Sequence, residues 1–555
     1  MISPKCVLVS LCFLGLSHPV DGQDLSHIWS QRFGDAWIQD AWSAAVDASG
    51  NVIVVGDFGG TVDFGGGPLT SLGDWDMFVV KFGPTGNHLW SKRFGDASVH
   101  EYQEGYRAAV DETGNVIVTG GFEGAVDFGG GPLTSAGSVD IFVVKFDPDG
   151  NHVWSKRFGD ASLQFGYGVA AGGSGDVIVV GDFVGTVAFG GDPLTSAGIW
   201  DIYVAKFDAS GDHLWSKRFG DADGQAANAV AVDGSGNVIV TGDFNGTVDF
   251  GGGALTSSGD TDIFVVKFDP DGNHVWSKRF GDALYQVGYR VAVDASGNVI
   301  VTGDFQGTVN FGGGPLTGVG EMDIYVVKLD ANGNHLWSKR FGDANDQWAE
   351  SVAVDGSGSV IVAGYFHGTV DFGGDPLGCV GDYDIYVVKL DANGNHLWSK
   401  RFGDANVQWA SSAAVDAFGN LLVTGAFGGT VDFGGGLLLS AGNRDIFVAK
   451  FADIATGISS MRIGNTLRLD AYPNPFNPVT AVTYFVPNLG LVDLRIYDVE
   501  GRLIRTLVRD VRDFGEHTAT WDGLDGRGVA VSSGIFFVRL EAGGQVATRK
   551  IAVLK

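Results

Sequence analysis

Cysteine is scarce, with only 3 in 555 residues. Cys6 and Cys12 lie in an apolar run, CVLVSLCFLGL, that follows a short positively charged start and is too short to span a bilayer. We expect residues 1–22 to be a secretory signal peptide that is removed near Gly22. Cys379 then remains alone, which excludes an intramolecular disulfide in the mature chain. Stability after export must therefore come from packing and from closure of the fold.

Positive charge is also in short supply. Lys and Arg number 36 against 65 Asp and Glu, which gives a formal net charge of −29 and a pI near 4.5. An acidic surface repels phosphate backbones, so nucleic acid is excluded as a partner, and anionic membranes are disfavoured for the same reason. Beyond the signal peptide no apolar run is long enough for a transmembrane segment. No helical period is visible either.

Glycine is abundant instead, at 88 residues, and one motif recurs along the chain. The motif reads NHVWSKRFGDA at 151–161, and its copies are spaced by 61 residues, apart from one spacing of 64. A fixed period of this kind indicates a repeat architecture. The tryptophans of the seven copies are Trp29, Trp90, Trp154, Trp215, Trp276, Trp337 and Trp398.

Each repeat contains four strand-like runs. In the unit that ends at Asp330 and its following strand they are YRVAVD, NVIVTGDF, DIYVVKLD and HLWSKRFG, separated by turns such as ASGN and ANGN and by one long glycine-rich loop. The second and third runs are almost continuously apolar, so both of their faces should be buried. The fourth run alternates, as an outer strand does. Four antiparallel strands with buried middle strands predict a β-propeller blade.

The copy count predicts how the propeller closes. The third-strand motif occurs seven times, and after its last copy, DIFVAKF at 445–451, no WSKRFG follows. The N-terminal HIWSQRFG supplies the missing strand. The sequence therefore predicts an all-β chain with a seven-bladed β-propeller at 23–453, closed by its N-terminal strand. Over 27–451 these motifs resemble the bacterial seven-bladed β-propeller (SBBP) repeat family, which implies an extracellular protein.

The repeat stops near Phe451, and a different pattern follows. We expect a linker at 454–470 and a small β-sandwich at 471–555, because short alternating runs are separated by Asp-Gly turns. The motifs YPNPFNP at 472–478, VDLRIYDVEGRLIRTL, GEHTATWDGLDGRG and SGIFFVRLEAGG occur there in order. They resemble the type A C-terminal sorting domain of the type IX secretion system, with the Ig-like fold also seen in flagellar hook-capping (FlgD-like) proteins. The resemblance implies export to the bacterial cell surface or medium, with the secretion machinery as partner. The alternative is an Ig-like module without a sorting role.

No catalytic residue, metal site or cofactor site is predicted. A histidine precedes every repeated Trp, from His27 to His396, but seven residues on seven outer strands cannot converge on one ion. Turns such as DPDGN offer too few oxygen ligands for a calcium loop and are explained as hairpin turns. No nucleophile elbow, phosphate-binding loop or zinc motif is present.

The segments after each RFGDA differ between repeats and give the candidate site. A glutamine recurs in all seven segments, and aromatic residues such as Trp348 and Trp409 flank most copies. These segments connect an outer strand to the next inner strand, so they should ring the mouth of the channel. Amides and flat rings are the groups that bind carbohydrate. The alternative is that the glutamines cap backbone groups and the aromatic rings wedge between blades. The glutamines are Gln39, Gln103, Gln164, Gln225, Gln286, Gln347 and Gln408.

These observations predict a secreted or cell-surface protein that binds or adheres and is not an enzyme. Its expected partner is a polysaccharide or a cell-surface protein. An extracellular propeller enzyme (hydrolase, lyase or quinoprotein type) would need an acid–base cluster in one blade, which the sequence does not reveal. A purely structural surface-layer component would self-associate without a soluble ligand.

Overall fold

The computed structural model describes residues 25–96, 103–453, 468–472, 474, 479–486, 490–512, 515–542 and 545–553. The expected signal peptide and most of the expected linker lie outside these ranges. The chain divides into two compact units, Met1–Ala455 and Thr456–Lys555. All the regular secondary structure in the described ranges is β-strand.

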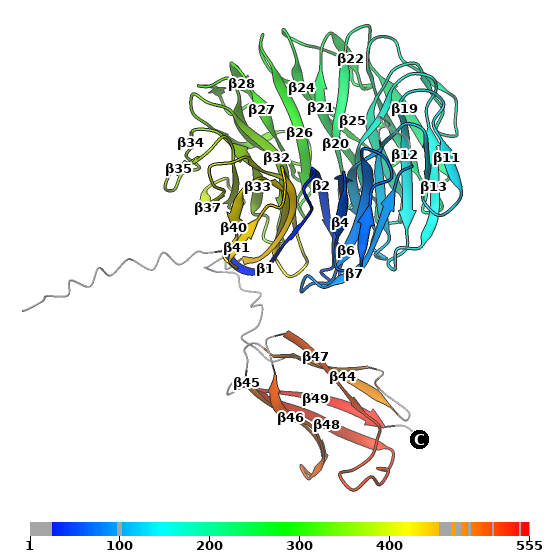
Figure 1. Cartoon of the computed structure of the whole chain (residues 1–555), viewed down its shortest axis with the longest axis vertical. Coiled ribbons are helices and arrows are strands. Elements are labelled where there is room, and N and C mark those ends of the chain that lie inside the picture. The colour runs from blue at the N-terminus through cyan, green and yellow to red at the C-terminus, as the bar shows by residue number, and fades with distance from the viewer. Residues whose placement is uncertain are drawn as a thin grey trace, which may run out of the picture. The chain divides into compact units, whose positions relative to one another are not determined.

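The first unit contains seven four-stranded antiparallel sheets (Figure 1). Six of them are each built from one continuous stretch of chain, and the last combines β38, β39 and β42 with the N-terminal β1. The first strands of neighbouring sheets contact one another, so these are the inner strands of the unit. The inner strands are β2 (Gln39–Val46), β8 (Gln103–Val110), β14 (Gln164–Ala171), β20 (Gln225–Val232), β26 (Gln286–Val293), β32 (Gln347–Val354) and β38 (Gln408–Val415). The second strands are β3 (Val52–Phe58), β9 (Val116–Phe122), β15 (Val177–Phe183), β21 (Val238–Phe244), β27 (Val299–Phe305), β33 (Val360–Phe366) and β39 (Leu421–Phe427).

The remaining strands of each sheet lie farther out. The third strands are β6 (Asp76–Phe82), β12 (Asp140–Phe146), β18 (Asp201–Phe207), β24 (Asp262–Phe268), β30 (Asp323–Leu329), β36 (Asp384–Leu390) and β42 (Asp445–Asp453). The outer strands are β7 (His88–Phe94), β13 (His152–Phe158), β19 (His213–Phe219), β25 (His274–Phe280), β31 (His335–Phe341), β37 (His396–Phe402) and β1 (Leu25–Phe33).

The hydrophobic core lies between neighbouring sheets. Every residue of β3 and β6 is buried, as the continuous apolar runs predict, because each middle strand is covered on both faces. One core cluster joins Phe33 to Phe78 and Phe82 of the next sheet, with Phe64 between them. The Phe64 ring centroid lies 4.8 Å from that of Phe78 and 5.0 Å from that of Phe33. Burial of this apolar surface is the main favourable term in the fold.

The glycine-rich loop between the second and third strands is more ordered than predicted, because it forms a short hairpin that delivers the core phenylalanine. In the first repeat the hairpin carries Phe64, and His88 of the outer strand lies across Gly66, where a Cβ would overlap the His88 ring. His88 Nε2 is also 3.0 Å from Ser91 Oγ. The repeated histidine therefore has a packing role, as expected. The hairpins are β4 (Thr61–Asp63) with β5 (Pro68–Thr70), β10 (Ala125–Asp127) with β11 (Pro132–Thr134), β16 (Thr186–Val187) with β17 (Leu194–Thr195), β22 (Thr247–Asp249) with β23 (Ala254–Thr256), β28 (Thr308–Asn310) with β29 (Pro315–Thr317), β34 (Thr369–Val370) with β35 (Leu377–Gly378), and β40 (Thr430–Asp432) with β41 (Leu437–Leu439).

The N-terminal strand completes the last sheet. Strand β1 pairs antiparallel with β42, as the copy count predicts, and Arg32 forms an ion pair with Asp445. The inner strands also meet, because the Ala44 N–H donates to Ser412 Oγ at 3.1 Å. The Ala108 N–H donates to Ser43 Oγ in the same way, at 3.2 Å. The sheets thus form a continuous, propeller-like series.

Charged residues of the repeat form buried ion pairs within each sheet. In the first repeat Lys81 Nζ lies 3.0 Å from Asp47 Oδ2, and both side chains are almost fully buried. Asp47 Oδ1 accepts hydrogen bonds from the Ser49 and Asn51 N–H groups at 2.9 Å, which closes the turn between β2 and β3. The carboxylate of this aspartate therefore stabilises the hairpin turn.

The second unit contains seven described strands in two sheets, ordered β43-β44-β47 and β46-β45-β48-β49. Its core contains Val482, Leu494, Trp521 and Val538. Strand β43 begins at Arg468, so the unit starts inside the segment expected to be linker. The strands are β43 (Arg468–Tyr472), β44 (Thr480–Val486), β45 (Gly490–Asp498), β46 (Leu503–Arg512), β47 (Gly515–Trp521), β48 (Gly534–Ala542) and β49 (Gln545–Val553).

Candidate functional site

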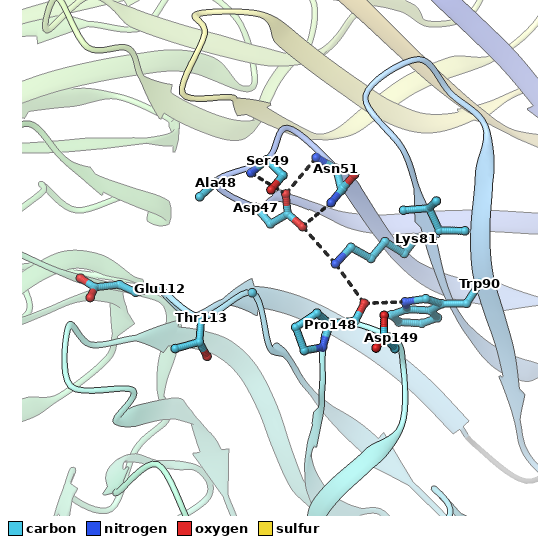
Figure 2. A pocket seen from close by; sticks show the side chains of 12 residues that line it. Asp47, Ala48, Ser49, Asn51, Lys81, Trp90, Glu112, Thr113, Pro148 and Asp149 are labelled. Atoms are coloured by element: carbon cyan, nitrogen blue, oxygen red, sulfur yellow. Dashed lines mark hydrogen bonds and ion pairs between the residues drawn. The ribbon is translucent and has the colours of Figure 1, made fainter. Parts of the chain in front are cut away.

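One pocket of the first unit lies between neighbouring sheets. It measures about 590 Å³ and is lined by turn residues of the first two repeats (Figure 2). Its polar groups bond one another, because Lys81 Nζ and Trp90 Nε1 donate to the Pro148 carbonyl at 3.2 and 3.0 Å. Other sheets repeat the indole bond to the turn of the next sheet. The repeated tryptophan therefore links neighbouring sheets, and we call this hydrogen bond the indole clasp. The polar groups of the pocket keep little hydrogen-bonding capacity for a ligand.

The predicted glutamines are buried and bonded within their own repeats. Gln286 Nε2 donates to Asp282 Oδ1 at 2.8 Å and to the Gln306 carbonyl at 3.0 Å, and its Oε1 accepts from the Asp282 N–H at 3.0 Å. A ligand would have to break these bonds to reach the amide. The structure therefore favours the alternative in which the glutamines hold backbone groups. The same donation from Nε2 to the carbonyl of the residue 20 positions later is made by Gln39, Gln103, Gln164, Gln225, Gln347 and Gln408.

Sequence reasoning singled out aromatic residues near the glutamines, but it missed that the residues three positions after the glutamines share one structural position. Every inner strand has a β-bulge there, which breaks the register with the second strand and redirects the bulged side chain. A glycine of the second strand makes room for it: a Cβ on Gly364 would collide with the Trp348 carbonyl, and equivalent glycines face the other inner strands. We call the bulged residues the bulge ring. They are Trp42, Tyr106, Tyr167, Asn228, Tyr289, Glu350 and Ser411.

The second pocket, of about 330 Å³, is the candidate site, and we call it the central pocket. Residues from five inner strands, β2, β8, β26, β32 and β38, converge on it, which places it at the centre of the series of sheets. The bulge ring contributes three lining residues. The full lining is Trp42, Arg107, Arg290, Glu350, Tyr365, Tyr383, Val407, Trp409 and Ser411.

Aromatic rings form one side of the central pocket. Trp409 lines it directly, and the Arg444 guanidinium lies 4.6 Å from the centroid of the Trp409 ring. Trp348 lies behind the lining, stacked on Tyr365 at 4.9 Å and edge-on to Tyr383 at 5.3 Å. Of the predicted site residues, the two tryptophans are thus gathered at this pocket, whereas the glutamines do not line it.

Arginines stand at the same inner-strand position in the second and fifth repeats. Arg290 Nη2 lies 3.5 Å from Glu350 Oε2, and burial lowers the Arg290 pKa while Glu350 opposes that shift. Arg107 Nη1 donates to the Trp42 and Tyr106 carbonyls at 2.7 and 2.9 Å. The pocket therefore combines flat rings with fixed guanidinium groups. The other five repeats carry small residues here: Ser43, Gly168, Ala229, Ser351 and Ser412.

A band of buried carboxyl groups surrounds the inner strands. Burial raises the pKa of Asp57 and of Asp304 well above the usual value. Burial and then the charge of Asp40 raise the pKa of Glu104 to about 7. Asp57 accepts a hydrogen bond from Trp42 Nε1, and Asp304 Oδ1 accepts one from the Ala349 N–H at 3.0 Å. The only sequence signal for this band is an Asp inside the apolar run VIVTGDF and its copies.

Metal-binding geometry is absent from the part of the chain that the structure describes, where His, Cys, Asp and Glu form no group able to hold an ion. A search of the same residues finds no helix with the length and apolarity needed to cross a membrane.

Two curated proteins are similar to most of this chain. An uncharacterized WD repeat-containing protein, L264, of Acanthamoeba polyphaga mimivirus is 23% identical over 551 residues, covering 78% of this chain and 39% of that protein. The regulatory protein FlaEY of Caulobacter vibrioides is 26% identical over 436 residues, covering 71% and 44%. The chain spans less than half the length of either relative.

The solved structures that match this chain share little sequence with it. PorZ, an essential bacterial surface component of the type IX secretion system of Porphyromonas gingivalis, is 12% identical, with a TM-score of 0.23 over 93% of this chain and 81% of that one. A Bacteroides caccae protein of unknown function is 12% identical, with a TM-score of 0.32 over 58% and 89%. The strand pairing of the first unit defines its architecture.

The C-terminal unit has the clearest match. Residues 470–554 match the family model of the secretion system C-terminal sorting domain. This match confirms the resemblance drawn from YPNPFNP and the motifs after it, and with it the expected export. The chain is an exported protein that carries a type IX secretion sorting domain and is directed to the cell surface or the medium.

Proposed function

We propose that this exported chain is a non-enzymatic binding protein and that its central pocket takes a carbohydrate. We further propose that residues 25–453 form a closed seven-bladed β-propeller and that the C-terminal unit is Ig-like. The sorting domain would then deliver the propeller to the cell surface, where the pocket faces extracellular polysaccharides.

The lining of the central pocket is the observation that supports this proposal. Trp42, Tyr365, Tyr383 and Trp409 supply flat apolar rings in a pocket whose volume is near the lower end of the range for small-molecule sites. Arg107, Arg290, Glu350 and Ser411 add hydrogen-bonding groups of both kinds. Rings that stack on sugar faces and polar groups that bind hydroxyls are the chemistry that carbohydrate recognition needs.

A polysaccharide-cleaving enzyme is the second candidate, and one carboxyl group favours it. A group with the pKa of Glu104, about 7, is suited to general acid catalysis near neutral pH. Glu104 is not among the residues that line the central pocket. We therefore prefer binding, and the enzyme candidate predicts that new reducing ends appear when the chain is incubated with a bound polysaccharide.

The test is binding of the full mature chain to a broad panel of polysaccharides, with and without Trp409→Ala and Trp348→Ala. We expect at least one polysaccharide to bind, and both variants to weaken that binding by about tenfold or more. Trp409 lines the pocket, and Trp348 supports the lining residues Tyr365 and Tyr383. Trp37→Ala is the matched control, since Trp37 is 66% exposed and does not line the pocket.

Each result has a clear reading. Loss of binding in the pocket variants at an unchanged melting temperature supports the proposal. Equal loss in Trp37→Ala would contradict the assignment to the central pocket, and absence of binding across the panel would contradict the proposed function itself.

A further inference from the structure

We propose that the central pocket selects a saccharide that bears a carboxylate, such as a uronic or sialic acid, and that Arg107 binds this carboxylate. The inference rests on the proposed function and deepens it by naming the ligand class. Arg107 would be the specificity residue, and the aromatic rings would hold the sugar ring.

The repeats themselves show that packing does not require an arginine at this position. Where the first and last repeats carry Ser43 and Ser412, the serine hydroxyl accepts the N–H of the next inner strand. A small residue thus completes the contact between neighbouring sheets. The second repeat replaces it with Arg107, in a chain that has 36 basic against 65 acidic residues. A cation at the centre of so acidic a protein calls for an electrostatic role.

The two arginines of the central pocket differ in how their charge is balanced. Glu350 lies 3.5 Å from Arg290 and compensates it. Arg107, by contrast, forms no ion pair with any residue that the structure describes, and its recorded bonds are to the Trp42 and Tyr106 carbonyls through Nη1 alone. Those bonds fix the guanidinium plane. The remaining N–H groups of the fork can then donate to both oxygens of a carboxylate.

The buried carboxyl groups nearby leave this positive charge in place. Asp40 is already paired with Arg444, at 2.6 Å. Asp57 and Asp304 are buried, and burial favours their neutral, protonated forms, as their raised pKa values indicate. A ligand carboxylate at Arg107 is therefore not opposed by a full set of ionised neighbours.

A second lining residue independently points to a missing hydrogen-bond partner. Ser411 is 6% exposed, lines the central pocket, and its Oγ has no hydrogen-bond partner among the described residues. Buried hydroxyl groups are normally bonded. A ligand oxygen in the pocket would satisfy this hydroxyl beside the aromatic lining, as a sugar hydroxyl or carboxylate can.

The experiment is calorimetric titration of the full mature chain with acidic oligosaccharides and their matched neutral forms. The probes are oligomers of galacturonic, glucuronic and mannuronic acid and sialyllactose, each beside the same molecule with its carboxyl group reduced to the alcohol. We expect an acidic form to bind at least about tenfold more tightly than its neutral counterpart, because a charge-assisted bidentate contact is lost on reduction. This preference should weaken as salt is added.

The variant Arg107→Gln should weaken binding of the acidic form much more than binding of the neutral form, so that the preference disappears. Arg527→Gln is the matched control, because it deletes one exposed guanidinium from the C-terminal unit. If Arg107→Gln does not fold, Ser411→Ala and the salt dependence of the unmodified chain decide the question. The Ser411→Ala variant should weaken binding of the acidic form by severalfold.

Failure of this inference is distinguishable from failure of the proposed function. Equal binding of acidic and neutral forms, abolished by Trp409→Ala, would leave the carbohydrate site standing and overturn the carboxylate inference. An acid preference that persists in folded Arg107→Gln would overturn the role of Arg107. Absence of binding to every saccharide would overturn both.

Discussion

At the scale of single residues, the same position of the repeat has different roles in different repeats. Ser43 and Ser412 join neighbouring inner strands, whereas Arg107 and Arg290 line the central pocket. The near-identity of the repeats makes these differences easy to find once the bulge is known. The same inner-strand position thus joins neighbouring sheets in some repeats and lines the central pocket in others.

Glu104 should make the stability of the first unit depend on pH. Its folded-state pKa is about 7, against 4.5 when exposed, so its stabilising contribution is fully present below pH 4.5 and is lost as the pH rises through 7. Between pH 5 and 8 we expect the free energy of unfolding to fall less in Glu104→Gln than in the unmodified chain. The difference should be about 1–2 kcal/mol after screening by solvent, and thermal unfolding at each pH measures it. The exposed Glu112→Gln is the control, and an identical pH profile for Glu104→Gln would contradict the assignment.

Gln286 offers a test of whether the repeated glutamine is structural. The variant Gln286→Ala leaves the Asp282 N–H without its acceptor and the Gln306 carbonyl without its donor, so we expect a loss of about 1–3 kcal/mol. Thermal unfolding measures this loss, and titration with the bound saccharide should show unchanged affinity. Weakened binding at an unchanged melting temperature would instead support a role of the repeated glutamines in ligand binding.

At the scale of strands, the sequence predicts regular structure well and its irregularities poorly. Alternation and turn residues are enough to place the four strands of each repeat, because their spacing follows directly from burial and hairpin geometry. The bulge is not visible as a pattern, since one extra residue hardly disturbs the alternation. Gly56 and its equivalents are the available signal: a glycine inside an apolar strand marks a close approach of another backbone.

The indole clasp between sheets should contribute measurably to stability. Trp276 Nε1 donates to the Ala331 carbonyl of the next sheet at 3.0 Å, and Trp276→Phe removes this bond while keeping an aromatic ring. We expect a loss of about 1 kcal/mol or somewhat more, because the carbonyl loses its donor and some packing is lost. Val275→Ala, on the 49% exposed neighbour, should change stability by less than about 0.5 kcal/mol. Equal effects of the two changes would contradict the clasp.

At the scale of the whole molecule, the central pocket exists only because separate repeats meet. Arg107, Arg290 and Glu350 come from three different repeats, and the sequence shows their order but not their convergence. Trp348 and Trp409 could be predicted near the channel because they follow a recognisable connecting segment. The carboxyl band could not, because each Asp stands alone within its own repeat.

Removal of residues 25–33 should open the last sheet. Strand β42 would lose its outer partner, and the buried carboxylate of Asp445 would lose Arg32. We expect the free energy of unfolding to fall by several kcal/mol, which lowers the melting temperature. We also expect molecules to associate through the exposed strand edge. Size-exclusion chromatography beside thermal unfolding detects both effects, with the chain beginning at residue 23 as the reference. A monomeric variant of unchanged stability would contradict the importance of the β1–β42 pairing.

The pairing of β1 with β42 has a consequence for biosynthesis. Arg32 and Asp445 are 413 positions apart, so a strand made at the start of translation waits for one made near the end of the propeller-like unit. A prematurely terminated product, however many complete repeats it contains, keeps two unsatisfied sheet edges. Only a chain that extends through β42 can therefore complete its last sheet. The exposed strand edges of a shorter product distinguish it from a finished molecule without any added factor.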